Sequence, residues 1–552
     1  MTNDSSTLPR RGYNSDSHYT SDYSSRQEIR DRRADEVNSR KFKSSILWTI
    51  VGTVIPGAGL LKTKARNLGI VIMGIAIAVL VFLAFMIKTR PARLISFFVR
   101  PSVLTMGAIG AVMLGLCLVA LIVASNLLNR PSPTTTKQRG ISGVIVALMC
   151  FLVTIPTFVA ASYFISSSSL INNVFRSQDS TRSETRPDLN PNQDQDSFWD
   201  SKPRLNLLLL GGDSAEDRAD SLGIRTDTII LASIDTKTGD TVFVQLPRNM
   251  AGARFSDSTE LGKKLVKYYP KGFTNGDSQD WRSMINSIWN EVPGDHPELF
   301  ANTDYPGADA LKIAVAGSIG IMPDYFMLID IDGIQALIDA MGGVKINVNQ
   351  KLPIGGGDGR RPVGYLYPGP EQLLSGYKAM WYARSRQSTN DYDRMGRQTC
   401  LMKAIIDQAN PSTMLTKYEA IAAAGQKMIK TDIPSEMLPH LVNLSWKVKD
   451  GSISRVLFVH LENGFNTNHP DFDMMTERVR IAIEGTKTGG EFGTAPSSPN
   501  GQGSGQTQAP QNPSGTTSPS QGSSSSSSSS SESKEGKPIE QVDDVCAYHP
   551  RS

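Results

Sequence analysis

Long apolar runs with little or no charge are concentrated in one early part of the chain. They occupy residues 46–61, 68–87, 103–128 and 143–165. A helix that crosses a bilayer needs about 20 apolar residues. The last three runs reach that length, whereas the first has 16 residues and contains Pro56 and Gly57. The pattern therefore predicts an α-helical membrane region over residues 45–165, with about three transmembrane helices.

The segments on either side of these runs indicate their orientation. Residues 1–44 are polar, and we expect a disordered tail there because they contain too few apolar residues to form a core. Their nine Lys and Arg residues favour the cytoplasm, and no run of signal-peptide type opens the chain. Three spans then place the chain after residue 165 outside the cell, whereas four full spans would put both ends of the chain on the same side. The basic residues of 88–100 would lie in an external loop, against the usual charge rule.

A globular pattern follows a polar linker. Residues 166–202 are rich in Ser, Asn, Asp, Pro and Arg, and we interpret them as an extracytoplasmic spacer. From 203 to 485, short apolar segments alternate with helical ones. Strands are expected at 205–210, 228–234, 242–246, 325–331, 345–348 and 455–460, and helices at 309–319, 333–341, 375–383, 394–409 and 417–428. This alternation predicts a layered α/β domain with a central sheet.

The end of the chain is low in complexity. Residues 486–552 are rich in Ser, Gly and Pro, with nine consecutive serines at 523–531, and we expect a disordered tail. We assign no role to residues 546–552. The four cysteines, at 117, 150, 400 and 546, form no CxxC pair. This argues against a disulfide scaffold and against a Cys-rich zinc site.

Overall composition narrows the class of function. The chain has 552 residues, of which 57 are basic and 53 acidic, and a net charge of +4. This near balance gives no support to nucleic-acid binding, which usually needs a marked basic excess. Six histidines without an HExxH motif give no support to zinc hydrolase chemistry.

Charged residues stand where three predicted strands begin or end. Asp213 follows the first strand after two glycines, Asp227 begins the second, and Arg248 follows the third. Ligands of open α/β sheets bind at the carboxyl ends of strands. Two neighbouring carboxylates repel each other unless a cation or an arginine neutralises them. Two hard oxygen ligands with open positions suit Mg²⁺ that bridges to phosphate. The alternative is that both aspartates cap turns and pair with Arg218 or Arg225.

A second group of charged residues lies between two predicted helices. Arg384 and Arg386 are two positions apart, so both side chains leave on one side if the chain is extended there. Arg394 and Gln398 are four apart and share a helix face. Arginine forks bind phosphate oxygens bidentately, so convergent arginines predict a ligand such as a pyrophosphate. The alternative is a solvated basic helix start paired with nearby aspartates.

Together these residues resemble the LytR-CpsA-Psr family of cell-wall glycopolymer ligases. The resemblance covers roughly residues 203–405. Its order and spacing agree at LLLLGGD (207–213), RTDTI (225–229), LPR (246–248), DAMGGV (339–344), the segment 369–376, RSR (384–386) and the positions 391, 394, 397 and 398. Asn249 stands where many members carry Asp, and the additional apolar runs depart from the single span that is common in the family.

The resemblance implies a fold, an activity and site residues. Family members form an α/β/α sandwich with an apolar pocket for a prenyl tail. They move a glycopolymer, with one phosphate, from a polyprenyl-pyrophosphate carrier to a peptidoglycan sugar hydroxyl. Asp213 and Asp227 would hold Mg²⁺ or Mn²⁺ against the pyrophosphate. Arg248, Arg384 and Arg386 would clamp its oxygens, Arg394 and Gln398 would complete the site, and Arg225 and Asp391 would orient it.

This chemistry agrees with the residue types. A loose phosphoryl transition state needs positioning and charge neutralisation more than covalent help. Asp227, Asp391 and Asp393 are candidate bases for the acceptor hydroxyl, and the sequence does not choose among them. The residues that either line the prenyl pocket or form ordinary core are Trp281, Ile285, Ile288, Trp289, Ile313, Val315 and Ile319.

Two other functions use the same features. A pyrophosphatase acting on lipid-linked or nucleotide pyrophosphates would use the same arginines and Mg²⁺ with water as the acceptor. A non-catalytic membrane regulator would bind a lipid pyrophosphate without turnover. The ligase hypothesis implies a carrier-linked glycan, peptidoglycan and membrane lipid as partners, and no nucleic acid. The sequence leaves the oligomeric state open.

Overall fold

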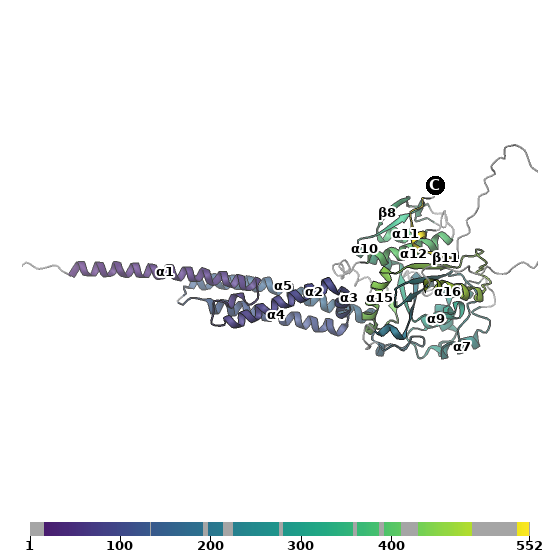
Figure 1. Cartoon of the computed structure of the whole chain (residues 1–552), viewed down its shortest axis with the longest axis horizontal. Helices are drawn as coiled ribbons and strands as arrows, with labels where there is room; N and C mark the ends of the chain where they lie inside the picture. Colours follow the sequence, from purple (N-terminus) through teal and green to yellow (C-terminus); the bar gives the residue numbers. More distant parts are fainter. Residues whose placement is uncertain are drawn as a thin grey trace, which may run out of the picture. The chain divides into compact units, whose positions relative to one another are not determined.

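The computed structural model describes residues 16–132, 134–190, 197–213, 225–274, 280–356, 361–385, 391–409, 429–487 and 538–550. These residues belong to two compact units (Figure 1). The first, which we call the helical unit, comprises Met1–Leu94 and Ser102–Ile165. The second, the sheet unit, comprises Ile95–Pro101 and Ser166–Ser552.

Long apolar helices form most of the helical unit. α2 (Arg66–Thr89), α4 (Pro101–Asn129) and α5 (Thr136–Val174) are long and apolar enough to cross a membrane. They contain the three runs predicted as spans. Many of their large apolar side chains are exposed, Leu80 and Phe158 among them, as expected where the surrounding solvent is lipid. A short helix, α3 (Pro91–Phe98), follows α2.

The N-terminal tail and the start of the first apolar run form one helix, α1 (Asp16–Val54). The expectation of a disordered tail is therefore wrong from Asp16 onward. Arg32, Glu36 and Arg40 follow one another at intervals of four residues, a spacing at which opposite charges stabilise a helix. α1 ends before Pro56 and Gly57, where Gly57 has a φ of 93°, and the short helix η1 (Ala58–Leu60) follows.

Polar contacts join η1, α4 and α5. Asn129 Nδ2 donates to the carbonyl of Gly59 at 2.7 Å, and Ser142 Oγ donates to Asn126 Oδ1 at 3.0 Å. Position 59 needs a glycine, because a Cβ there would lie 2.1 Å from Ser125 Oγ. In a membrane, such close packing and interhelical hydrogen bonds hold helices together, since burial of apolar surface provides no net driving force.

A mixed seven-stranded sheet forms the centre of the sheet unit, in the order β11-β10-β3-β2-β1-β4-β9. The strands are β1 (Arg204–Asp213), β2 (Arg225–Asp235), β3 (Thr241–Leu246), β4 (Tyr325–Asp330), β9 (Ile429–Thr431), β10 (Ile453–Leu457) and β11 (Ile539–Gln541). β1 runs parallel to β4 and antiparallel to β2, and β3 runs parallel to β10 and antiparallel to β2. The last residues of β1, β3, β4 and β10 therefore meet the first residues of β2 at one end, the carboxyl end of the sheet.

Helices cover both faces of the sheet and make an α/β/α sandwich (Figure 1). One face packs against α7 (Glu260–Tyr268), α8 (Ile288–Asp295), α9 (Pro306–Ile319) and α16 (Phe472–Lys487). The other packs against α12 (Asp391–Gln408), α15 (Leu438–Asp450) and α17 (Val542–Cys546). The predicted α/β class and sandwich architecture are confirmed. The central strands read as continuous apolar runs because both faces are buried.

A second, smaller core lies beside the large sheet. It contains α10 (Ile331–Met341), α11 (Gly376–Arg384) and two small sheets. In one, β5 (Val344–Val348) pairs with β8 (Gly369–Leu374), and in the other β6 (Leu352–Ile354) pairs with β7 (Gly364–Leu366). Apolar side chains of α12 also enter this core, so α12 joins the two cores.

Most predicted elements form with small changes at their ends. The strand expected at 455–460 is β10, which ends at Leu457. The helix expected at 417–428 lies outside the described residues. Five of the residues considered for a pocket wall are fully buried in the main core: Ile285, Ile288, Ile313, Val315 and Ile319. They form ordinary core.

The C-terminal part departs from the predicted low-complexity tail at both ends. α16 continues to Lys487, and residues 538–550 return to the sheet unit as β11 and α17. Cys546, at the end of α17, forms a disulfide with Cys400 of α12. Cysteine spacing did not predict this bond, because the two residues are 146 positions apart and meet only through the fold. Residues 488–537 lie outside the described part, where disorder stays a prediction.

Candidate functional site

Strand direction brings the first group of predicted site residues to the carboxyl end of the sheet. Asp213 is the last residue of β1 and pairs across the ladder with Arg225, the first residue of β2. Gly212 pairs on its other side with Asp330 at the end of β4. The side chains of Asp213 and Arg225 lie outside the described part of the chain. Their backbones lie at the carboxyl end of the sheet, and the roles of their side chains stay a prediction.

Asp227 and Arg248 contact each other at this end. Arg248 Nη1 donates to Asp227 Oδ1 at 2.5 Å. The neighbouring Thr226 is fully buried, so the alternation of a strand turns Asp227 outward. The two side chains keep 33% and 41% of their surface, which leaves the pair open to a ligand. The described partner of Asp227 is therefore Arg248. Arg218, the alternative considered from sequence, lies outside the described residues.

Backbone contacts hold the loop that carries Arg248. Its carbonyl accepts from Asn286 N at 3.3 Å, and the carbonyl of Met250 accepts from Ile285 N at 2.8 Å. Thr226 Oγ1 of β2 donates to the carbonyl of Asn286 at 3.5 Å, so the segment that supports the Arg248 loop is itself bonded to β2. Because Met250 is buried, the loop cannot shift without disturbing the core. Arg248 is thus presented from a rigid support.

α12 contacts β3 close to Arg248. Gln245 Nε2, on the second-last residue of β3, donates to Gln398 Oε1 at 2.6 Å. Gln398 therefore reaches the same end of the sheet as Arg248, which follows β3 by two residues. Arg394 lies one turn earlier on α12 and is half-buried. Gln245 could not be identified from the sequence, because an apolar strand with one glutamine gives no sign of the helix that covers it.

Arg384 and Arg386 come from the connection between α11 and α12. Arg384 ends α11 and is exposed, with its guanidinium carbon 5.9 Å from the centre of the Trp381 ring. Arg386 lies outside the described residues, and so does the side chain of Asp391, which begins α12. The structure thus brings Asp227, Arg248 and Gln398 to one end of the sheet and leaves the placement of Arg386 a prediction.

Arg397 has a supporting role that its position in the motif did not reveal. It is buried, with Nε donating to the carbonyl of Tyr382 at 2.7 Å and Nη2 donating to the carbonyl of Ser385. These contacts fix the end of α11 against α12, immediately before Arg386. The sequence showed Arg397 next to Gln398 in the motif. It could not show whether this arginine binds a ligand or supports the fold, because that depends on whether the side chain is buried.

A divalent cation fits the donor chemistry at this end. Arg248 contacts Oδ1 of Asp227, and the carboxylate retains Oδ2. Among the described side chains, no group of three or more His, Cys, Asp or Glu is arranged to hold a metal. Mg²⁺ does not need such a cage, because it is usually bound by one or two carboxylates with substrate phosphates and waters. The residues present therefore suit a cation shared with a phosphate.

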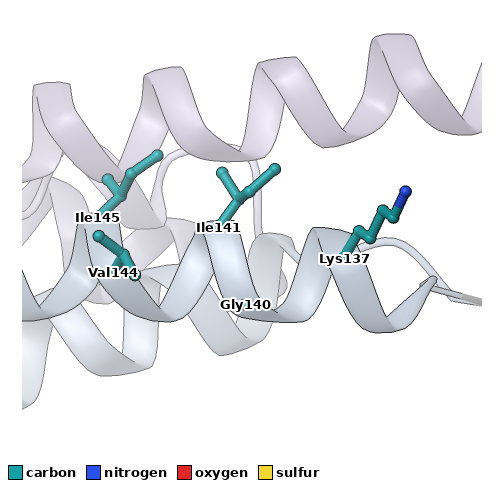
Figure 2. A pocket seen from close by; sticks show the side chains of 5 residues that line it. All are labelled: Lys137, Gly140, Ile141, Val144 and Ile145. Carbon is teal, nitrogen blue, oxygen red and sulfur yellow. The ribbon is translucent and has the colours of Figure 1, made fainter.

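A hollow elsewhere in the molecule lacks this chemistry. It lies along α5 in the helical unit and is lined by Lys137, Gly140, Ile141, Val144 and Ile145 (Figure 2). Four of these residues are uncharged and apolar or small, and the fifth is a lysine. The hollow has no acidic ligand and no arginine, so it does not serve phosphoryl chemistry.

Comparison with known proteins identifies relatives of the sheet unit. The model of the LytR_cpsA_psr family matches residues 164–478. Biofilm regulatory protein A of Streptococcus mutans is 24% identical over 277 residues, which are 48% of this chain and 59% of that protein. Polyisoprenyl-teichoic acid–peptidoglycan teichoic acid transferase TagU of Oceanobacillus iheyensis is 25% identical over 281 residues, 50% of this chain and 73% of that protein.

Comparison with solved structures also gives matches, at low sequence identity. The crystal structure of TagV from Bacillus subtilis aligns at 20% identity with a TM-score of 0.36, covering 52% of this chain and 97% of that one. A structure of TagT bound to LI-WTA aligns at 15% identity with a TM-score of 0.30, covering 50% of this chain and 83% of that one. The chain spans about three fifths of the Streptococcus mutans relative, so the match concerns part of each protein.

Proposed function

Since the chain belongs to the LytR-CpsA-Psr family, we propose that it is a membrane-anchored phosphotransferase that attaches a glycopolymer to peptidoglycan. Its donor is a glycan carried on a polyprenyl pyrophosphate, and its acceptor is a sugar hydroxyl of peptidoglycan. Relatives named as teichoic acid–peptidoglycan transferases support attachment of a glycopolymer as the activity. The polyprenyl carrier and the phosphate transfer are our proposal.

One observation carries the proposal: the Arg248–Asp227 pair at the carboxyl end of the sheet, with α12 tied beside it through Gln398. A guanidinium already held by a carboxylate is preorganised to receive an anion. Arginine forks match phosphate oxygens, and more arginines lie on the adjacent connection and on α12. A diphosphate has enough negative oxygens to engage several of them.

The reaction follows from this arrangement. The acceptor hydroxyl oxygen forms a bond to the phosphorus next to the glycan. The bond from that phosphorus to the bridging oxygen breaks, and polyprenyl phosphate leaves with the electron pair. The hydroxyl proton passes to a base, for which Asp227, Asp391 and Asp393 are the candidates. Arg248, Arg384 and Arg386 bind the phosphate oxygens, so the charge of the loose transition state is balanced by fixed groups.

Asp213 and Asp227 are the residues that would hold Mg²⁺ or Mn²⁺. When bound there, the ion would offset negative charge on the pyrophosphate oxygens. Arg394 and Gln398 would complete the site from α12, and Arg225 and Asp391 would orient it. Each well-placed donor contributes on the order of 3 kcal/mol, or about a hundredfold in rate.

The helical unit accounts for the lipid-linked substrate. We propose that α2, α4 and α5 span the membrane, with the N-terminus in the cytoplasm and the sheet unit outside the cell. Enzyme and carrier then meet in the plane of one membrane. The carrier's prenyl tail stays in lipid while its glycan and the acceptor are in the wall space.

A transfer assay tests the proposal. Full-length protein in lipid nanodiscs is incubated with purified peptidoglycan and geranylgeranyl pyrophosphate that carries one radiolabelled N-acetylhexosamine. We expect label in the insoluble wall fraction, dependent on protein and on Mg²⁺. A free phosphorylated sugar as the product would instead identify a pyrophosphatase. Binding of the probe without any product would identify a regulator.

A further inference from the structure

The C-terminal segment, residues 538–550, completes the sheet unit from far along the chain. β11 pairs antiparallel with β10, so that Glu540 lies opposite Arg455. Ile539 and Val542 are buried in the cores on the two sides of the sheet. The segment is therefore an integral part of the fold, although residues 488–537 separate it from α16.

Glu540 joins β10 to the first turn of α12. Its Oε2 accepts from Arg455 Nε at 2.9 Å and from Arg455 Nη2 at 2.5 Å, and its Oε1 accepts from Tyr392 Oη at 2.5 Å. Arg455 is 1% exposed. A buried guanidinium is costly without an anion, and Glu540 is the carboxylate that pairs with it. Burial and the bond to Glu540 raise the pKa of Tyr392 to about 12, so its phenol keeps the proton that it donates.

This contact acts on the part of α12 that approaches the candidate site. The guanidinium of Arg455 lies 5.3 Å from the centre of the Tyr392 ring. A Cβ on Gly396 would lie 3.1 Å from Arg455 Nη1, so the helix passes directly over this arginine. Two residues later Gln398 contacts Gln245 of β3. The first turns of α12 therefore rest on Arg455 at one point and on the end of β3 at another.

Further contacts fasten the same segment to its surroundings. Cys546 is bonded to Cys400 of α12, with a Cα–Cα distance of 5.4 Å. Asp543 lies 3.1 Å from Lys403 of α12. The carbonyl of Cys546 accepts from Asn347 Nδ2 of β5 at 2.9 Å. These links keep the segment beside α12. They reach α12 at Cys400 and Lys403, beyond Gln398, whereas Glu540 contacts Tyr392 in the first turn.

We propose that Glu540 is a positioning residue of the active site, and that it sets the first turns of α12 through Arg455 and Tyr392. This inference rests on the proposed function. Arg394 and Gln398 lie on the positioned turns, and Arg397 transmits their position to the end of α11 through its bonds to Tyr382 and Ser385. A shift of about 1 Å in groups that hold a reacting phosphate can lower the rate about a hundredfold.

Two measurements on full-length protein in lipid nanodiscs test this role. The variants are Glu540→Gln, which keeps the shape but removes the charge, and Tyr392→Phe, which removes only the phenol oxygen. Amide hydrogen exchange reports the order of residues 391–398. Steady-state transfer from the geranylgeranyl pyrophosphate probe reports kcat and KM separately. Asp543→Asn is the matched control, because it neutralises a carboxylate on the same segment that contacts α12 beyond the site.

In Glu540→Gln we expect faster exchange over residues 391–398 and a kcat lowered about 10- to 100-fold, with KM changed about threefold or less. Tyr392→Phe should also speed exchange and lower kcat, each by a smaller factor. Asp543→Asn should leave the exchange rate and kcat unchanged. Unchanged exchange in Glu540→Gln would overturn the inference, and so would faster exchange with unchanged kcat. A kcat loss equal to the loss of folded protein, measured by thermal unfolding, would also overturn it.

The proposed function can fail separately. If the wild-type protein transfers nothing from the probe, the phosphotransferase proposal is wrong for this substrate. The exchange comparison still decides whether Glu540 orders the first turns of α12.

Discussion

Arg248 Nη1 lies 2.5 Å from Asp227 Oδ1, so the second residue after β3 is paired with the third residue of β2 at the carboxyl end of the sheet. The pair neutralises itself and remains partly exposed. In the proposed function, the diphosphate of the donor would meet a guanidinium whose direction is already set by Asp227. Exposed ion pairs contribute only about 0–1 kcal/mol to stability, so loss of this pair should cost the fold little, and its role in the proposed function is to bind the donor.

Replacing Arg248 should therefore reduce activity more than stability. For Arg248→Ala we expect kcat/KM for the geranylgeranyl pyrophosphate probe to fall about a hundredfold, the effect of one lost donor to a developing charge. Arg248→Lys keeps the charge but loses the fork, and should recover only part of the rate. Arg254→Ala is the control, since Arg254 forms a comparable exposed pair with Asp473 at 3.1 Å. Equal activity in Arg248→Ala and Arg254→Ala would rule out this role.

Arg384 is expected to contribute through its exposed guanidinium. In Arg384→Ala, kcat/KM should fall about a hundredfold while the midpoint of thermal unfolding stays the same, because the side chain is not part of a core. Arg386→Ala should behave alike if the connection between α11 and α12 brings both to the diphosphate. Full transfer activity in both variants would contradict the proposed clamp. Arg480→Ala on α16 is the control, because the ion pairs described for this exposed arginine are with Glu477 and Glu484 of its own helix.

Removal of divalent cations should stop transfer. We expect EDTA to abolish incorporation of label into peptidoglycan, and Mg²⁺ or Mn²⁺ to restore it. Asp227→Asn should raise the cation concentration needed for half-maximal transfer, because an amide oxygen is a weaker ligand for a hard cation than a carboxylate. Transfer at full rate in EDTA would show that the reaction does not need a divalent cation.

Stability, in contrast, depends on a charged pair far from this chemistry. Lys312 Nζ on α9 lies 2.8 Å from Asp432 Oδ2, and both side chains are fully buried. Lys312→Met leaves the Asp432 carboxylate without its cation, and we expect a loss of about 3–5 kcal/mol in unfolding free energy. Adding Asp432→Leu should recover only part of it, because the apolar pair removes the uncompensated charge but leaves the Phe326 N–H and the Asp324 carbonyl without the bonds they make to Asp432 and Lys312. Thermal unfolding of the single and double variants measures the unfolding free energy of each. A loss in the double variant equal to the sum of the two single losses would contradict this prediction.

Long apolar strands and the charged residues that follow them could be predicted from the sequence. β1, β2 and β3 are runs of apolar residues with clear ends, so their order placed Asp213, Asp227 and Arg248 near one another. The partner of Asp227 could not be predicted, because it depends on strand register. The described contact comes from Arg248, two residues after the neighbouring strand β3.

Elements of a few residues could not be predicted because their stability comes from distant partners. β9 and β11 have three residues each and exist as strands only through pairing with β4 and β10. The same applies to Glu540, which follows a low-complexity stretch and gains its role from Arg455. α1 was missed for a different reason: its polar composition suggested disorder, whereas the four-residue spacing of its opposite charges favours a helix.

The most direct test of the central claim follows the glycan-proximal phosphorus of the donor. The probe carries a phosphorus label at that position and a second label in its sugar, and the wall fragments released by a muramidase are analysed after incubation with full-length protein. We predict both labels on one peptidoglycan fragment, joined through a phosphodiester, and initial rates of labelling about a hundredfold lower with Arg248→Ala. Sugar label without phosphorus in the wall, or both labels only in a soluble sugar phosphate, would contradict it.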